Sequence, residues 1–109
     1  MNDERAVFVY TTHPSLVEAE RIGKAVLEKR LAACVNILPG MISYYWWEGA
    51  IERSEEVVMI IKTRASRAEE VRAAVKEMHS YTVPAILVLP IEGGEPAYLD
   101  WLMREAAPR

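Results

Sequence analysis

The sequence predicts an α+β fold in which two strand–helix–strand units follow one another and a short helix closes the chain. Three observations predict it. Short β-prone runs alternate with segments of helical periodicity, glycine and proline mark the boundaries, and 51% of the 109 residues are apolar. This length and composition fit one domain over residues 1–109. A charged fraction of 27% with a net charge of -3 excludes the disordered class.

The first strand and the first helix are predicted over residues 6–11 and 15–31. Residues 6–11 are nearly all apolar and β-prone, which is typical of a strand buried on both faces. Ser15 and Glu18 have the spacing of a capping box, and apolar residues then recur every three or four positions. The segment from Ser15 is therefore expected to form an amphipathic helix.

A long β-hairpin is predicted next. Residues 33–47 are apolar and aromatic, with Pro39 and Gly40 suited to a bulge, and Gly49 allows a tight turn before the return strand over residues 51–63. At about 3.3 Å per residue, the first of these strands would reach about 45 Å, more than the width of such a domain. The hairpin should therefore project, and its far end carries four aromatic residues: Tyr44, Tyr45, Trp46 and Trp47.

The rest of the chain is predicted to form a helix, a strand and a final helix. Ser66 and Glu69 have the spacing of a second helix cap, and apolar residues follow on one face up to residue 78. Residues 82–89 have the composition of the last strand, and residues 96–104 that of a short amphipathic helix. This order predicts a ferredoxin-like βαββαβ sandwich with a long hairpin and a C-terminal helix.

The apolar pattern of the strands predicts an oligomer. Residues 6–10, 57–61 and 85–89 are apolar at both odd and even positions, so both faces of the sheet should be buried. Right-handed crossovers place both main helices on one face. We therefore expect further subunits to cover the other face, with the four aromatic residues of the hairpin in the contact.

Potential metal ligands are few and far apart in the sequence. Cys34, His13 and His79 are the only cysteine and histidine residues, and no motif has closely spaced ligands. In the predicted sheet the last strand lies antiparallel beside the first, which brings His13 near His79 and Tyr81. One interpretation is a metal site of these residues with His79 as the stronger ligand; the alternative is that His79 caps the second helix. Cys34 is interpreted as a buried packing residue.

Four ordered blocks of the sequence resemble the CutA family of divalent-cation-tolerance proteins. They are RLAACVN at residues 30–36, ILPGMISYYWWEGAIE at 37–52, IKT at 61–63 and HSYTVPAI at 79–86. The resemblance implies a ferredoxin-like fold, a tight homotrimer akin to PII-type signalling proteins, and tolerance to copper and other divalent metals. Some family members carry a cysteine at the position of Thr11 and a second histidine at that of Met78, two ligands that this chain lacks.

The resemblance leads to an expected function. We expect weak binding of Cu²⁺ or another divalent metal in a homotrimer, with no obligatory cofactor and no enzymatic activity, since no residue set has catalytic spacing. The alternative is a PII-like sensor that binds a small anion or nucleotide and signals to a protein partner, which the sequence does not identify. Nucleic acid and membranes are not expected as partners, because 16 acidic residues outnumber 13 basic ones and no long apolar segment occurs. The lack of a signal-peptide pattern predicts a cytoplasmic protein.

Overall fold

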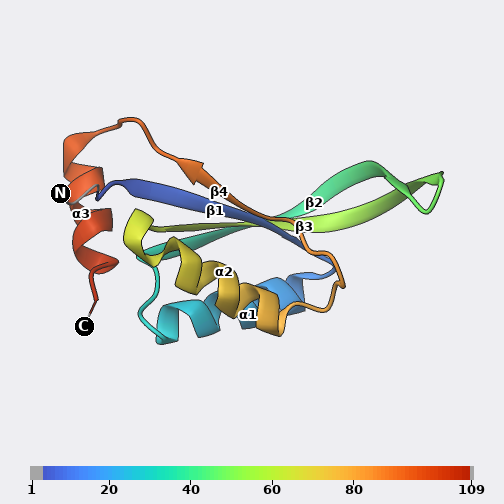
Figure 1. The fold of residues 1–109 in the computed structure, drawn as a ribbon, viewed down its shortest axis with the longest axis horizontal. Helices are drawn as coiled ribbons and strands as arrows, with labels where there is room; N and C mark the ends of the chain where they lie inside the picture. The colour runs from blue at the N-terminus through green and yellow to red at the C-terminus, as the bar shows by residue number, and fades with distance from the viewer. Residues whose placement is uncertain (1–3, 109) are drawn as a thin grey trace.

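The computed structural model describes residues 4–108 and shows the predicted order of elements with one added turn of 3-10 helix (Figure 1). The four strands form a single antiparallel sheet in the order β2-β3-β1-β4, which confirms the ferredoxin-like α+β prediction. The elements are β1 (Ala6–His13), α1 (Leu16–Glu28), β2 (Cys34–Trp47), β3 (Ala50–Arg64), η1 (Ala65–Arg67), α2 (Ala68–Met78), β4 (Ile86–Pro90) and α3 (Pro96–Glu105).

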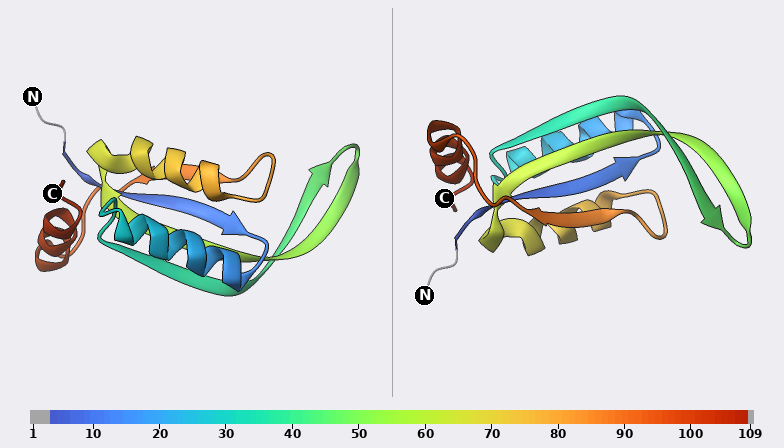
Figure 2. Two further views of the ribbon diagram at one scale, coloured as in Figure 1. Left: turned by 90° about the horizontal axis from the view of Figure 1, so that it is seen from below. Right: turned by 90° about the horizontal axis from the view of Figure 1, so that it is seen from above.

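Helices α1 and α2 lie side by side on one face of the sheet, as Figures 1 and 2 show. Gly23 allows α1 to pack closely, because a Cβ there would lie 2.8 Å from the Met59 sulfur on β3. Within residues 4–108, every helix is too short or too polar to cross a membrane. The core between helices and sheet consists of fully buried apolar side chains, among them Val9, Ile22, Val26, Met59, Ile61, Val71 and Val75.

The opposite face of the sheet is partly exposed. On this face Tyr10 of β1 lies between Ile60 of β3 and Leu87 of β4, because side chains alternate along a strand and its neighbour Val9 points into the core. Leu87 is 57% exposed. An apolar face of this kind is the physical reason to expect further copies of the chain, and the oligomer stays a prediction.

The β2–β3 hairpin projects beyond the helices and gives the molecule a long axis of 46 Å, against 26 and 25 Å for the other two (Figure 1). A β-bulge between Leu38 and Met41 bends β2, and Gly40 in the bulge has a φ of 90°. Glu48 and Gly49 form the turn with φ values of 50° and 82°, as the turn prediction required. The four aromatic residues of the predicted contact are exposed along this projection: Tyr44, Tyr45, Trp46 and Trp47.

The predicted cap of the second main helix is wrong. Helix α2 begins at Ala68 after η1, and no side chain caps it. Ser66 instead donates its hydroxyl to the Glu4 carboxylate near the start of the chain at 2.6 Å, and Glu69 pairs with Arg72. Both side chains therefore bond to charged partners in place of the helix end, and the spacing of a capping box alone does not indicate these partners.

The first strand extends to His13, two residues beyond its predicted end, and two other element ends differ by more than this. The last strand begins at Ile86 and not at Thr82, because Pro84 has no N–H to donate to a ladder and residues 79–85 form a loop. The first helix ends at Glu28 and not near residue 31, since Arg30 adopts a left-handed φ of 60°. The loop at residues 79–85 matters for the site, because it carries His79 and Tyr81.

Candidate functional site

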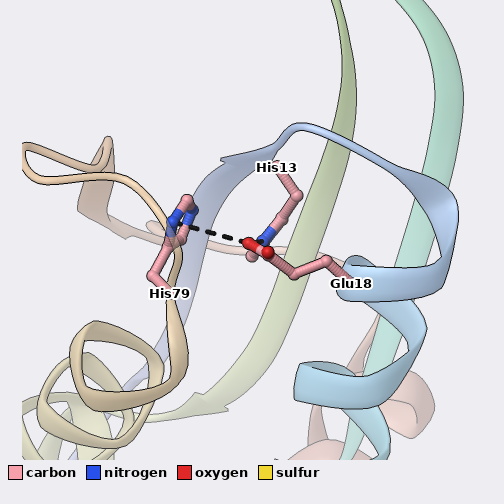
Figure 3. A group of neighbouring side chains, drawn as sticks. All are labelled: His13, Glu18 and His79. Atoms are coloured by element: carbon pink, nitrogen blue, oxygen red, sulfur yellow. Dashed lines mark ion pairs between the residues drawn. The ribbon is translucent and has the colours of Figure 1, made fainter.

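The fold brings His13, Glu18 and His79 together where β1 ends and α1 begins (Figure 3). His13 is the last residue of β1, Glu18 lies in the first turn of α1, and His79 directly follows α2. One potential ligand atom from each lies within 4.8 Å of the others, and the two imidazole rings stack with their centroids 4.7 Å apart. The two histidines were predicted from sequence, and the carboxylate was not.

Glu18 was missed because its spacing from Ser15 indicated a helix cap. The predicted cap by Ser15 is confirmed, since the Glu18 N–H donates to Ser15 Oγ at 3.1 Å. Its carboxylate, however, accepts a 3.4 Å bond from the Ser80 N–H. The same oxygen, Oε2, lies 3.8 Å from Nδ1 of His13 and 3.6 Å from Nδ1 of His79. Glu18 thus has a cap role through its backbone and a site role through its side chain.

The hydrogen bonds around His13 define its tautomer. The Thr11 hydroxyl donates to the Met59 carbonyl at 3.0 Å, so Thr11 Oγ1 must accept the proton of His13 Nε2, 2.8 Å away. Nδ1 of the neutral ring therefore carries a lone pair. This Nδ1 has no hydrogen-bond partner, although His13 is fully buried. An unpartnered nitrogen lone pair beside a carboxylate fits a bound cation, because buried polar atoms otherwise have partners.

Both ring nitrogens of His79 are already engaged. Nε2 lies 2.6 Å from the Thr12 carbonyl, which can only accept, so Nε2 carries the proton. Nδ1 accepts the Tyr81 N–H at 3.0 Å. His79 also occupies the C-cap position of α2, as the alternative interpretation proposed, although these ring bonds go to residues outside the helix. The geometry thus favours His13 over His79 as the readier ligand, the opposite of the order expected from sequence.

Burial determines the protonation of the cluster. Desolvation and, next, the neighbouring His79 lower the pKa of His13 to about 4, against a smaller opposing effect of Glu18. Desolvation alone would raise the pKa of Glu18, but hydrogen bonds from Ser80 and the nearby imidazoles lower it overall. At neutral pH a lone pair of His13 therefore faces an ionised carboxylate with no proton between them. These are the protonation states that metal ligands require.

Tyr81, the third predicted ligand, directs its hydroxyl away from the cluster. The hydroxyl donates to Glu56 Oε2 at 3.0 Å, while the ring packs against His79 with centroids 4.8 Å apart. Burial, followed by the hydrogen bond to Glu56, raises the pKa of Tyr81 to about 12. In this geometry Tyr81 contributes its backbone N–H to the site, and coordination by its phenol stays a prediction.

A groove of about 710 Å³ lies beside the cluster, between the hairpin and the loop at residues 79–85. Tyr81 and the buried Glu56 form part of its wall. The remaining wall includes aromatic and sulfur-containing side chains from β1 and the hairpin, namely Tyr10, Met41, Tyr45 and Trp47. The groove and the cluster therefore share the loop that carries His79 and Tyr81.

Cys34 is half-buried, so its interpretation as a buried packing residue is correct only in part. Its sulfur lies 3.9 Å from the Tyr98 hydroxyl, which also accepts a 3.1 Å bond from Lys62. Cys34 pairs with Lys62, and Lys62 with Phe8, on the sheet face opposite α1 and α2. Phe8 precedes His13 by five residues on β1, so Cys34, on the same row of the sheet as Phe8, lies outside the cluster.

Comparisons with known proteins agree with the fold and with the resemblance. A family model described as CutA1 divalent ion tolerance protein matches residues 7–105. A divalent-cation tolerance protein CutA of Archaeoglobus fulgidus is 58% identical over 95 residues, which are 87% of this chain and 92% of that protein. One from Thermus thermophilus is 46% identical over 94 residues, 86% of this chain and 91% of that protein.

Solved structures show the same similarity. The structure described as the periplasmic divalent cation tolerance protein CutA from Archaeoglobus fulgidus has a TM-score of 0.89 at 54% identity, covering 94% of this chain and 99% of that chain. The divalent ion tolerance protein CutA1 from Ehrlichia chaffeensis has a TM-score of 0.90 at 28% identity, covering 98% and 100%. The backbone arrangement is therefore shared across a wide range of sequence identity.

Proposed function

The chain belongs to the CutA1 family of divalent ion tolerance proteins, and we propose that it acts by binding a divalent metal at the cluster of His13, Glu18 and His79. The observation that carries this proposal is the buried, unpartnered Nδ1 of His13, which faces the Glu18 carboxylate. Imidazole nitrogen and carboxylate oxygen are donors that Zn²⁺ and Cu²⁺ accept in proteins. Binding is expected to be weak, because only three side chains converge and His79 must first release Tyr81.

Thr11 and Glu18 have separate roles in this proposal. The Thr11 hydroxyl holds the His13 ring so that Nδ1 faces Glu18. In this proposal Thr11 orients a ligand and is not a ligand itself. Glu18 supplies the negative charge that offsets the charge of the cation. Holding a cation reversibly requires no chemical step, and we propose that the chain is not an enzyme.

Calorimetric titration of Zn²⁺ and Cu²⁺ at pH 7 tests the proposal. In Glu18→Gln the carboxylate charge is lost with little change in shape, and we expect affinity to fall by at least about tenfold. Glu20→Gln is the matched control, because Glu20 lies on the same helix with an exposed side chain and should leave affinity unchanged. Equal affinities in the two variants would contradict the assignment of the cluster.

We further propose that the chain assembles as a homotrimer. The exposed apolar sheet face and the projecting aromatic hairpin support an oligomer, and the number three comes from the family resemblance. No observation on residues 4–108 favours the alternative of a small-anion or nucleotide sensor. Cytoplasmic location also stays a prediction, which fractionation of cells that produce the protein would test.

A further inference from the structure

Two backbone N–H groups bond to side chains that a metal at the cluster would use. The Ser80 N–H donates to Glu18 Oε2, and the Tyr81 N–H donates to His79 Nδ1. Of the three nitrogen and oxygen atoms that converge, only His13 Nδ1 has no hydrogen bond. The loop after α2 therefore holds two of the three donor side chains in a bonded state.

Tyr81 connects this loop to the groove. Its hydroxyl donates to Glu56 on β3, a residue that is only 9% exposed, and its ring packs on His79. Residues 80–83 all line the groove, together with Met41 and Trp47 of the hairpin. A displacement of the Tyr81 backbone would therefore affect His79 on one side and the wall of the groove on the other.

We propose that metal binding at the cluster releases the Tyr81 N–H from His79 and thereby moves the wall of the groove. The neutral His79 ring has one lone pair, on Nδ1, and can turn it to a cation only when the Tyr81 N–H no longer occupies it. The Glu18 carboxylate has further lone pairs and can keep its bond from Ser80. This inference rests on the proposed function and extends it, because it gives metal binding a structural effect outside the cluster. By linkage, the hydrogen bond from the Tyr81 hydroxyl to Glu56 weakens metal binding, and loss of this bond strengthens metal binding.

Tyr81→Phe tests the coupling, because it removes the hydroxyl bond to Glu56 and keeps the N–H bond to His79. We expect its Zn²⁺ affinity, measured by calorimetry, to rise about three- to tenfold, the effect of one hydrogen bond. Tyr10→Phe is the matched control. Tyr10 lines the same groove, but its hydroxyl bonds to the Met41 sulfur and not to the loop, so affinity should stay unchanged.

Residue-resolved hydrogen exchange supplies a second measurement on the parent chain. With saturating Zn²⁺, the amide of Tyr81 should exchange faster than without metal, although ligands usually slow exchange. If Zn²⁺ binds while this amide keeps its protection, the coupling is overturned and the proposed function stands. Weaker binding by Tyr81→Phe would also overturn the coupling and would identify the phenol as a ligand. If the parent chain fails to bind Zn²⁺, the proposed function itself falls.

Discussion

At the scale of single residues, burial of His13 makes the stability of the protein depend on pH. Its pKa is about 4 in the folded chain against an ordinary value of 6.5, with Glu18, His79 and Glu56 as the titratable groups that face it. Between these values the unfolded chain binds more protons, so the free energy of unfolding falls as pH decreases from about 6.5 to about 4. The predicted loss reaches about 3 kcal/mol at the lower end.

Urea unfolding at fixed protein concentration between pH 4.5 and 7.5, with a chelator present, measures this loss. In His13→Gln the slope of the free energy against pH should be smaller by up to about one proton in the same range. Glu18 adds to the loss at low pH in both proteins, because its pKa is also lowered in the folded state. Identical slopes in the parent and the variant would show that His13 is not the group responsible.

The pairing of His13 with His79 could be predicted from sequence, whereas the chemistry of each ring could not. Antiparallel adjacency of the first and last strands sufficed to bring the two histidines together. The tautomers depend on the backbone carbonyls of Met59 and Thr12. Every residue has such a carbonyl, so no residue type in the sequence indicates these bonds. Glu18 was not predicted as a site residue for a different reason. Its spacing from Ser15 is explained by the helix cap, which the structure confirms.

At the scale of elements, the hairpin turn contains a residue poorly suited to its conformation. Glu48 has a φ of 50°, a region that asparagine tolerates better than glutamate, and Gly49 follows it with a φ of 82°. Glu48→Asn should therefore raise the free energy of unfolding by about 0.5–1 kcal/mol. Denaturant unfolding measures it, with Glu52→Asn as a control in the extended backbone of β3. No gain, or an equal gain in the control, would count against this explanation.

Elements with local signals were predicted well, and those held by distant contacts were not. The bulge and turn of the hairpin follow from Pro39, Gly40 and Gly49, whose backbone preferences act locally. The last strand was predicted to begin too early, at residue 82, although Pro84 cannot donate to a ladder. The preceding residues Ser80 and Tyr81 are held by bonds to Glu18 and His79, which no local pattern indicates. That error falls at the candidate site, where tertiary bonds outweigh propensity.

At the scale of the whole molecule, the exposed sheet face should control assembly. Light scattering should give about three times the 12.4 kDa of one chain. Leu87→Arg places a charge on the apolar face, on the edge strand β4, and should lower the measured mass. Val17→Arg is the control, since Val17 is 77% exposed on α1, on the other side of the sheet, and the mass should stay that of the parent. A well-folded monomeric parent at micromolar concentration would contradict the proposed assembly.

The projecting hairpin has a consequence for the amount of folded protein. In the described chain, the distal parts of β2 and β3 pair only with each other, and a lone two-stranded ribbon is marginally stable in water. In the proposed trimer its stability comes from neighbours, so folding of this region follows mass action. At a low concentration of the chain, the hairpin would remain unfolded and accessible to proteases. The quantity of intact protein would then rise more steeply than the rate of synthesis, so that this part of the fold acts as a threshold on abundance.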